Sequence, residues 1–204
     1  MFDYIIKKHP VPHIIIDNFY TDEELKYVWE ELEFLTVNAK LKDPSKTDSA
    51  IDYTGKIIKQ NKGLFLHHEY DSKDKSPIAY YTDKIYNSHF LEEIRYKHWL
   101  FNYMVLSNHN TTLVSYYENG DYYDGHYDTS VLTCLIHLHK EPKLFTGGDL
   151  HLPDFNYTIE DKNNRLLLFP SSVLHKVNPV SISETNKNSC NGRYTITKFM
   201  GITL

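Results

Sequence analysis

Residues 117–128 read YENGDYYDGHYD, and this stretch ends on Gly125-His126-Tyr127-Asp128. Side chains two positions apart on a β-strand point to the same face of the strand. If this stretch is extended, the imidazole of His126 and the carboxylate of Asp128 lie side by side and can share one metal ion. A third protein ligand must then come from another part of the chain.

His175 is the candidate for this third ligand. It follows an apolar run at residues 166–169 and a turn at 170–172, a position that a barrel can bring beside the first pair. Two imidazoles and one carboxylate on one side of a metal form the facial triad typical of non-haem iron(II) sites, with open positions opposite. The His-x-Asp spacing alone is weak evidence, because the chain has 12 histidines and a strand-end histidine can simply hydrogen-bond a neighbouring acid.

The composition favours one globular domain. The chain has 204 residues, of which 41% are hydrophobic and 24% are charged, and its net charge of −5 disfavours a broad nucleic-acid-binding surface. Two cysteines, Cys134 and Cys190, cannot form a disulfide framework. Residues 1–8 lack the pattern of a signal peptide, and no apolar run approaches the roughly 20 residues that cross a bilayer. We therefore expect a cytoplasmic protein without a membrane segment.

The first part of the chain predicts helices. A short apolar strand is expected at residues 11–16, and the helix that follows begins with a capping box made by Thr21 and Glu24. Its apolar side chains recur at helical spacing, at Leu25, Val28, Trp29, Leu32 and Leu35. A second helix is expected at residues 88–101. The polar, lysine-rich segment 38–62 is interpreted as a mobile connection or a lid, with disorder as an equal alternative.

The second part of the chain predicts a β-rich core. Candidate strands are residues 111–116, 131–138, 150–152, 165–169, 173–180 and 193–199. Short strands separated by turn residues indicate a sandwich or a barrel rather than alternating β and α units. We expect a single domain over residues 1–204, with a helical supporting region to about residue 110 and a β core from about residue 111.

The surroundings of the three candidate ligands resemble those of the 2-oxoglutarate-dependent oxygenases of the prolyl 4-hydroxylase type. That family combines Tyr-x-x-Gly-x-x-Tyr-x-x-His-x-Asp, a Gly-Gly turn, His-x-Val-x-Pro-Val and a basic residue that opens the last strand. The matching residues here are Tyr117, Gly120, Tyr123, His126, Asp128, Gly147, Gly148, His175, Val177, Pro179, Val180 and Arg193. The opening at residues 14–20 is also similar, so the resemblance covers nearly the whole chain, least so at residues 38–89.

The resemblance implies an α+β fold that is mostly β, with a double-stranded β-helix, or jelly roll, as its core and helices packed outside one sheet. It implies that His126, Asp128 and His175 bind Fe(II) and carry catalysis, with 2-oxoglutarate and O₂ as cosubstrates and ascorbate as a candidate reductant. The implied activity is that of a dioxygenase that hydroxylates a C–H bond, most simply of a proline in a peptide or protein, and releases succinate and CO₂.

The resemblance also implies a site for the cosubstrate. Arg193 would pair with the distal carboxylate of 2-oxoglutarate, Tyr117 would help to hold it, and Tyr123 would lie toward the substrate. A planar guanidinium suits a carboxylate because it offers two parallel charge-assisted hydrogen bonds. Lys198 is the rival cation, but its position in the strand has the opposite parity, so it and Arg193 cannot both face the pocket.

The chain departs from the family pattern at three places. A polar loop at residues 181–192 lengthens the approach to Arg193, Phe199 replaces the family's tryptophan, and Leu150 stands where the prolyl enzymes often have threonine. These departures bear on the contacts with 2-oxoglutarate and on the assignment of Arg193.

Other readings of the sequence remain. His137 and His139 alternate on one strand face, but no acidic or cysteine partner stands at useful spacing, so we expect ordinary strand histidines. The pair His67-His68 is expected on the surface. A non-catalytic jelly-roll protein that binds a metal or ligand is the alternative from another class, and an oxygenase acting on a small molecule or on nucleic acid is a further one. Fold analogy does not name the substrate, and the oligomeric state is left open.

Overall fold

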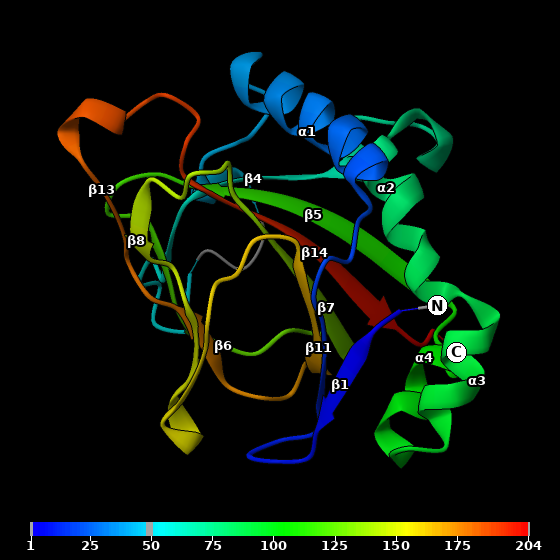
Figure 1. Ribbon diagram of the computed structural model, residues 1–204. Helices are drawn as coiled ribbons and strands as arrows, with labels where there is room; N and C mark the ends of the chain where they lie inside the picture. The colour runs from blue at the N-terminus through cyan, green and yellow to red at the C-terminus, as the bar shows by residue number, and fades with distance from the viewer. Residues whose placement is uncertain (1, 48–50, 204) are drawn as a thin grey trace.

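The structure is a computed structural model, and it describes residues 2–47 and 51–203 of the chain. Two antiparallel sheets face each other, and helices cover the outer side of the larger sheet (Figure 1). The larger sheet has the strand order β1-β2-β11-β7-β14-β5-β4. Its strands are β1 (Tyr4–Lys7), β2 (His13–Ile16), β4 (Lys62–Phe65), β5 (His109–Tyr117), β7 (Leu132–Leu138), β11 (Arg165–Pro170) and β14 (Arg193–Gly201).

The smaller sheet has the strand order β10-β9-β12-β6-β3, and β8 and β13 form a further two-stranded sheet. These strands are β3 (Lys59–Gln60), β6 (Tyr122–His126), β8 (Phe145–Gly147), β9 (Leu150–Leu152), β10 (Tyr157–Ile159), β12 (His175–Val177) and β13 (Val180–Ile182). The α-helices are α1 (Asp22–Val37), α2 (Pro77–Thr82), α3 (Ser88–Arg95) and α4 (Asn102–Leu106). Two facing antiparallel sheets with helices on one outer side confirm the predicted α+β, mostly β, jelly-roll architecture.

Alternation along the central strands builds a core on each side of the larger sheet. In β11, Leu166 and Leu168 point to the helices, whereas Leu167 and Phe169 point between the two sheets. Both faces of this strand are therefore buried, which is why its sequence is one continuous apolar run. The helical side of this core includes Val28, Leu32, Leu35, Ile78, Ile85, Phe90 and Ile94. The space between the sheets is left for a second core and for the candidate site.

The first helix forms as its sequence predicts. The backbone N–H of Glu24 donates to Thr21 Oγ1 at 3.3 Å, and the backbone N–H of Thr21 donates to Glu24 Oε2 at 2.8 Å. This capping box satisfies donors that the first turn of a helix leaves without partners. The apolar face of the helix packs on the larger sheet as expected, so α1 supports the sheet without contributing to the site.

Several predicted boundaries are wrong. The helix expected at residues 88–101 ends at Arg95, because His98 is extended and its ring Nδ1 accepts from the N–H of Leu100, which starts a new turn. The strand expected at residues 173–180 is split into β12 and β13, and Pro179 between them has no N–H to donate. The supporting region contributes β2, within the strand predicted at residues 11–16, and also β1, β3 and β4, which were not predicted.

The polar segment 38–62 is partly built into the smaller sheet. Lys59 and Gln60 form β3, which pairs with Tyr123 and Tyr122 of β6. A bridge between Ile51 and Ile57 precedes this strand, and residues 48–50 lie outside the described residues. The end of the segment is therefore a wall of the site, and the lid interpretation of the remainder stays a prediction.

Candidate metal centre and cosubstrate cavity

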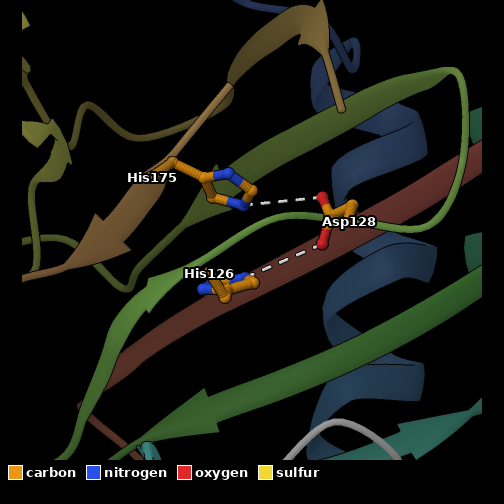
Figure 2. A group of neighbouring side chains, drawn as sticks. All are labelled: His126, Asp128 and His175. Carbon is orange, nitrogen blue, oxygen red and sulfur yellow. Dashed lines mark ion pairs between the residues drawn. The ribbon is translucent and has the colours of Figure 1, made fainter. Parts of the chain in front are cut away.

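The three predicted ligands come together between the two sheets. His126 is the last residue of β6 and His175 is the first of β12, and the two residues are paired directly across the smaller sheet. Their Nε2 atoms lie 3.7 Å from Asp128 Oδ1 and 3.5 Å from Asp128 Oδ2, respectively. Figure 2 shows the three side chains pointing toward one another. One ligand atom from each lies within 4.8 Å of the others, which is compact enough for one ion.

Asp128 reaches the site by a route that differs from the expected one. The strand ends at His126, so Asp128 lies in the loop that follows and not two positions along a strand. Its backbone N–H donates to the carbonyl oxygen of Ser171 at 3.1 Å, and its Oδ2 accepts from Thr133 Oγ1 at 2.5 Å. The predicted turn before His175 thus holds the carboxylate ligand as well.

Backbone carbonyls fix the orientation of both imidazoles. His126 Nδ1 lies 2.9 Å from the oxygen of Asp124, and His175 Nδ1 lies 2.8 Å from the oxygen of Val173. A carbonyl oxygen can only accept, so each Nδ1 carries the hydrogen and each Nε2 turns its lone pair to the centre. Burial, with the nearby His175, lowers the pKa of His126 to about 3. Two imidazoles and one carboxylate are a donor set that fits Fe(II).

A cavity of about 420 Å³ extends from this centre between the sheets. Along β14 every second residue lines it, from Arg193 through Thr195 and Thr197 to Phe199. Tyr117 lines the Arg193 end, and Leu150 also reaches the cavity. Both residues that depart from the family pattern, Phe199 and Leu150, are therefore in a position to change contacts within the cavity.

Arg193 lies fully buried in the wall of this cavity. Its Nε donates to Asp161 Oδ1 at 2.8 Å, and its guanidinium carbon lies 4.9 Å from the centre of the Tyr117 ring. Within residues 2–47 and 51–203, its Nη1 has no hydrogen-bond partner although it is buried. A buried donor without a partner costs about 1–3 kcal/mol, so the cavity is built to receive an acceptor here. A carboxylate at this end of the cavity fits that demand.

Lys198 lies on the opposite face of β14, as its parity predicts. Its ammonium pairs with Asp83 Oδ1 at 2.5 Å, on the side of the helices. Gly148 explains how Arg193 can take its place: its φ is +78°, and a Cβ there would lie 2.6 Å from Arg193 Cδ. The Gly147-Gly148 turn therefore gives the arginine side chain the room that any larger residue would occupy.

Three residues near the site were not predicted from the sequence. Lys59 is buried in the cavity wall, where its ammonium donates to Thr47 Oγ1 at 3.1 Å and lies 5.3 Å from the centre of the Tyr123 ring. Asp161 and Thr133 are the partners of Arg193 and Asp128 described above. None of these stands in a local pattern that indicates a site, since each meets its partner only through the fold.

Tyr123 and the remaining histidines also have defined places. The ring of Tyr123 stacks on His126 with 3.6 Å between centroids and 10° between planes. His137 is a buried strand histidine as expected, but the expectation that it lacks an acidic partner is wrong, because its Nδ1 lies 2.7 Å from Asp161 Oδ1. His67 and His68 are exposed, as predicted. Across the described part of the chain, His126, Asp128 and His175 are the only cluster of three or more potential ligands.

Comparison with known proteins agrees with this geometry. Residues 112–201 match the model of the family described as the 2OG-Fe(II) oxygenase superfamily. A prolyl 4-hydroxylase from Pseudomonas putida is similar at 14% identity and a TM-score of 0.61, over 94% of this chain and 93% of that one. A prolyl hydroxylase from Trichoplax adhaerens, solved with a peptide fragment of the hypoxia-inducible factor oxygen degradation domain, is similar at 16% identity and a TM-score of 0.63, over 93% and 83%.

A third similar structure is the viral collagen prolyl hydroxylase of Paramecium bursaria Chlorella virus-1 in its 2OG complex. It shares 16% identity at a TM-score of 0.51, over 94% of this chain and 96% of that one. Comparison with the sequences of curated proteins found no match. Among the described residues, no helix has the length and apolar character needed to cross a membrane. Residues 112–201 thus match the 2OG-Fe(II) oxygenase superfamily, and the fold of the chain is similar to that of the solved prolyl hydroxylases.

Proposed function

We propose that this protein hydroxylates a C–H bond of a proline in a peptide or protein, with Fe(II) held by His126, Asp128 and His175. The observation that carries the proposal is one cavity that is lined both by the three candidate metal ligands and by Arg193, a buried guanidinium whose Nη1 has no hydrogen-bond partner among the described residues. A protein that only binds a metal has no need of an anion-binding group in the same cavity. The arrangement therefore favours catalysis over binding alone.

Each residue has a role that its contacts support. Fe(II) with 2-oxoglutarate and O₂ supplies the oxidising chemistry that inserts one oxygen atom and leaves succinate and CO₂. Arg193 binds the distal carboxylate of 2-oxoglutarate, and the hydroxyl of Tyr117, next to the guanidinium, is placed to share that carboxylate. Thr133 orients Asp128 through its 2.5 Å hydrogen bond. Tyr123 braces the ring of His126 and forms the adjoining wall on the substrate side.

A peptide substrate is favoured by the outer part of the cavity. Beyond Phe199 the cavity is lined mostly by uncharged residues such as Thr111, Ile202 and Thr203, together with His109, and Tyr127 beside the ligands is 59% exposed. This wall suits an uncharged ring on a longer chain better than a charged metabolite or a phosphate. The Trichoplax adhaerens protein, which was solved with a peptide fragment, is consistent with such a substrate.

A screen of 2-oxoglutarate decarboxylation tests this function. The iron-loaded protein is offered proline-containing peptides, free amino acids and oligonucleotides, and each product is examined for the mass gain of one oxygen. We expect succinate to form in step with hydroxylated proline peptide. Iron-loaded protein that never forms succinate favours the non-catalytic binding protein, and oxygen insertion into a free amino acid or an oligonucleotide favours the other oxygenases.

Two further parts of the proposal concern conditions. We propose ascorbate as the reductant that keeps the iron in the Fe(II) state, and its omission should shorten the time over which succinate accumulates. We also propose a cytoplasmic location, which is supported by Cys134 and Cys190 being free thiols. Fractionation of cells with antibody detection checks the location.

A further inference from the structure

Asp161 is a carboxylate buried directly behind Arg193. Both side chains are 0% exposed, and the carboxylate Oδ1 accepts from Arg193 Nε at 2.8 Å. His137 Nδ1 lies 2.7 Å from the same oxygen, and Lys143 Nζ donates to Oδ2 at 3.1 Å. The backbone N–H of Asp161 is bound as well, to Asp149 Oδ1 at 2.8 Å. This carboxylate is therefore held in place on every side.

The hydrogen on His137 decides which donors of Arg193 are used. His137 Nδ1 lies within 2.7 Å of Asp161 Oδ1 and within 3.0 Å of Arg193 Nη2. An ionised carboxylate can only accept, so Nδ1 must carry the hydrogen and donate it to Asp161. Nδ1 then has no lone pair for Nη2, and the 3.0 Å approach is a contact rather than a hydrogen bond.

The guanidinium is consequently anchored on one edge and open on another. Its Nε–H is bound to Asp161, whereas Nη1 has no partner in the described part of the chain and Nη2 keeps its hydrogens. Nη1 and Nη2 together form the end of the guanidinium fork, the geometry that matches two oxygens of a carboxylate. Gly148 and the ring of Tyr117 pack against the side chain and limit its other movements.

We propose that Asp161 is a positioning residue, which holds Arg193 by Nε so that the Nη1–Nη2 edge receives the distal carboxylate of the 2-oxo acid. The inference rests on the proposed function and extends it, because it makes the preference for a dicarboxylic 2-oxo acid depend on Asp161 and His137. A simple counter-ion role predicts the opposite effect. If Asp161 merely neutralised Arg193, its removal would strengthen the attraction between the guanidinium and an anionic ligand.

The test compares two ligands that differ only at the distal end. Calorimetric titration of anaerobic, Fe(II)-loaded protein with 2-oxoglutarate and with 2-oxopentanoate, which has a methyl group in place of the distal carboxylate, isolates that interaction. In Asp161→Asn we expect affinity for 2-oxoglutarate to fall about 10- to 100-fold, the range for a hydrogen bond to a charged group. Affinity for 2-oxopentanoate should change by less than about 2-fold. In turnover, KM for 2-oxoglutarate should rise while kcat at saturation stays within a few-fold.

Lys140→Met is the matched control. It removes a lysine that pairs with Glu33, outside the contacts of Asp161 and Arg193, so both affinities should stay near those of the wild type. His137→Leu is a second variant with no change of buried charge, and it should weaken binding of 2-oxoglutarate alone by about 2- to 10-fold. It keeps the proposal open to test where Asp161→Asn does not fold.

Three outcomes overturn the inference. Folded Asp161→Asn that binds 2-oxoglutarate as tightly as the wild type, or more tightly, points to a counter-ion. An equal loss for both 2-oxo acids points to general damage of the site. Wild-type protein that does not prefer 2-oxoglutarate over 2-oxopentanoate overturns the proposed role of Arg193, and the role of Asp161 with it.

Discussion

Strand β14 buries a cation on each of its faces. The two cations differ in the groups that their N–H donors contact. Arg193 faces the cavity and Lys198 faces the helices, and both side chains are fully buried. Each is paired with an aspartate, Arg193 with the fully buried Asp161 and Lys198 with Asp83, whose side chain is 33% exposed. Burial and pairing are thus nearly the same on the two faces.

The difference lies in the donors that remain. The ammonium of Lys198 is also 3.4 Å from Thr112 Oγ1 of the neighbouring strand β5 and 5.7 Å from the centre of the Tyr86 ring, so it has contacts besides Asp83. Arg193 lines the cavity with the metal ligands, and its Nη1 has no hydrogen-bond partner among the described residues. The proposed role of Arg193 therefore rests on its unpartnered donor and not on its burial.

The largest effect should come from the cavity face, at the metal ligands. His126→Ala or His175→Ala should abolish turnover and iron binding, because each removes one of three donors. Asp128→Glu should lower turnover on the order of 100-fold, since a displacement of about 1 Å at a reacting centre has that effect. Iron content measures metal binding, and succinate formation measures turnover. His151→Ala, outside the site, is the control, and full activity in His175→Ala contradicts the assignment.

The next effect should be that of Arg193. Arg193→Ala should weaken binding of 2-oxoglutarate by roughly 30- to 4,000-fold, because losing one partner of a buried charge pair costs about 2–5 kcal/mol. Iron binding should be almost unchanged, since the metal has its own ligands. Arg193→Lys should recover only part of the affinity, because a point charge does not reproduce the fork. Titration with 2-oxoglutarate measures the affinity, and an unchanged dissociation constant in Arg193→Ala would remove Arg193 from the site.

The features that the sequence predicts well depend on local rules. The capping box of Thr21 and Glu24 is settled by four adjacent residues, and the opposite facing of Arg193 and Lys198 follows from the alternation of a strand. The motif also predicted that His126, Asp128 and His175 lie near one another. Asp128, however, lies after the end of the strand, where its backbone N–H donates to the carbonyl of Ser171, so alternation within the strand does not place it. The motif therefore predicted that the three side chains lie close together, but the expected alternation of His126 and Asp128 within one strand is wrong.

What could not be predicted depends on contacts between distant parts of the chain. Asp161 meets Arg193 across 32 positions and His137 across 24, and its own neighbours form an ordinary polar turn. Lys59 lies in the lysine-rich segment that was interpreted as a mobile connection or a lid, yet the pairing of β3 with β6 buries it beside Tyr123. Such partners become visible only when the register of several strands is known.

The helical face should show a moderate effect, and on stability alone. Lys198→Met should lower the free energy of unfolding by about 1–3 kcal/mol, less than a fully buried pair, because Asp83 is partly exposed and can be hydrated. Each kcal/mol corresponds to roughly 2–4 °C in Tm for a chain of this size. The dissociation constant for 2-oxoglutarate should stay within about 2-fold of the wild type.

The double variant Lys198→Met with Asp83→Asn is the control for this stability effect. Replacing a buried ion pair by uncharged groups is often close to neutral, so much of the lost stability should return. Thermal unfolding of the three proteins provides the comparison. If Lys198→Met weakens 2-oxoglutarate binding more than Arg193→Ala does, the two faces of β14 are assigned the wrong way round.

The smallest effect should come from a third aspartate–cation pair, which lies near the surface. Asp17 accepts two hydrogen bonds from Arg165, at 2.6 and 3.1 Å, and one from Lys162 at 2.7 Å, and its side chain is 34% exposed. The hydrogen bond from Arg165 is the largest cause that lowers the pKa of Asp17 from 3.8 to about 2. Because the folded-state pKa is the lower one, this pair stabilises the fold above pH 3.8, and the contribution is lost as the pH falls toward 2.

Asp17→Asn should therefore cost less than about 1 kcal/mol at pH 6, because water and salt screen an exposed pair. The difference in the free energy of unfolding between Asp17→Asn and the wild type should shrink when both proteins are unfolded with urea at about pH 3. At that pH part of the stabilisation by the Asp17 pair is lost. Raising the salt concentration at pH 6 should shrink it too, whereas the effect of Lys198→Met should respond less, since screening acts weakly on buried charges. A difference that grows on acidification would mean that Asp17 binds its proton more tightly in the folded state. Asp17 would then be a carboxyl governed by burial, as Asp128 is, and not one governed by its arginine.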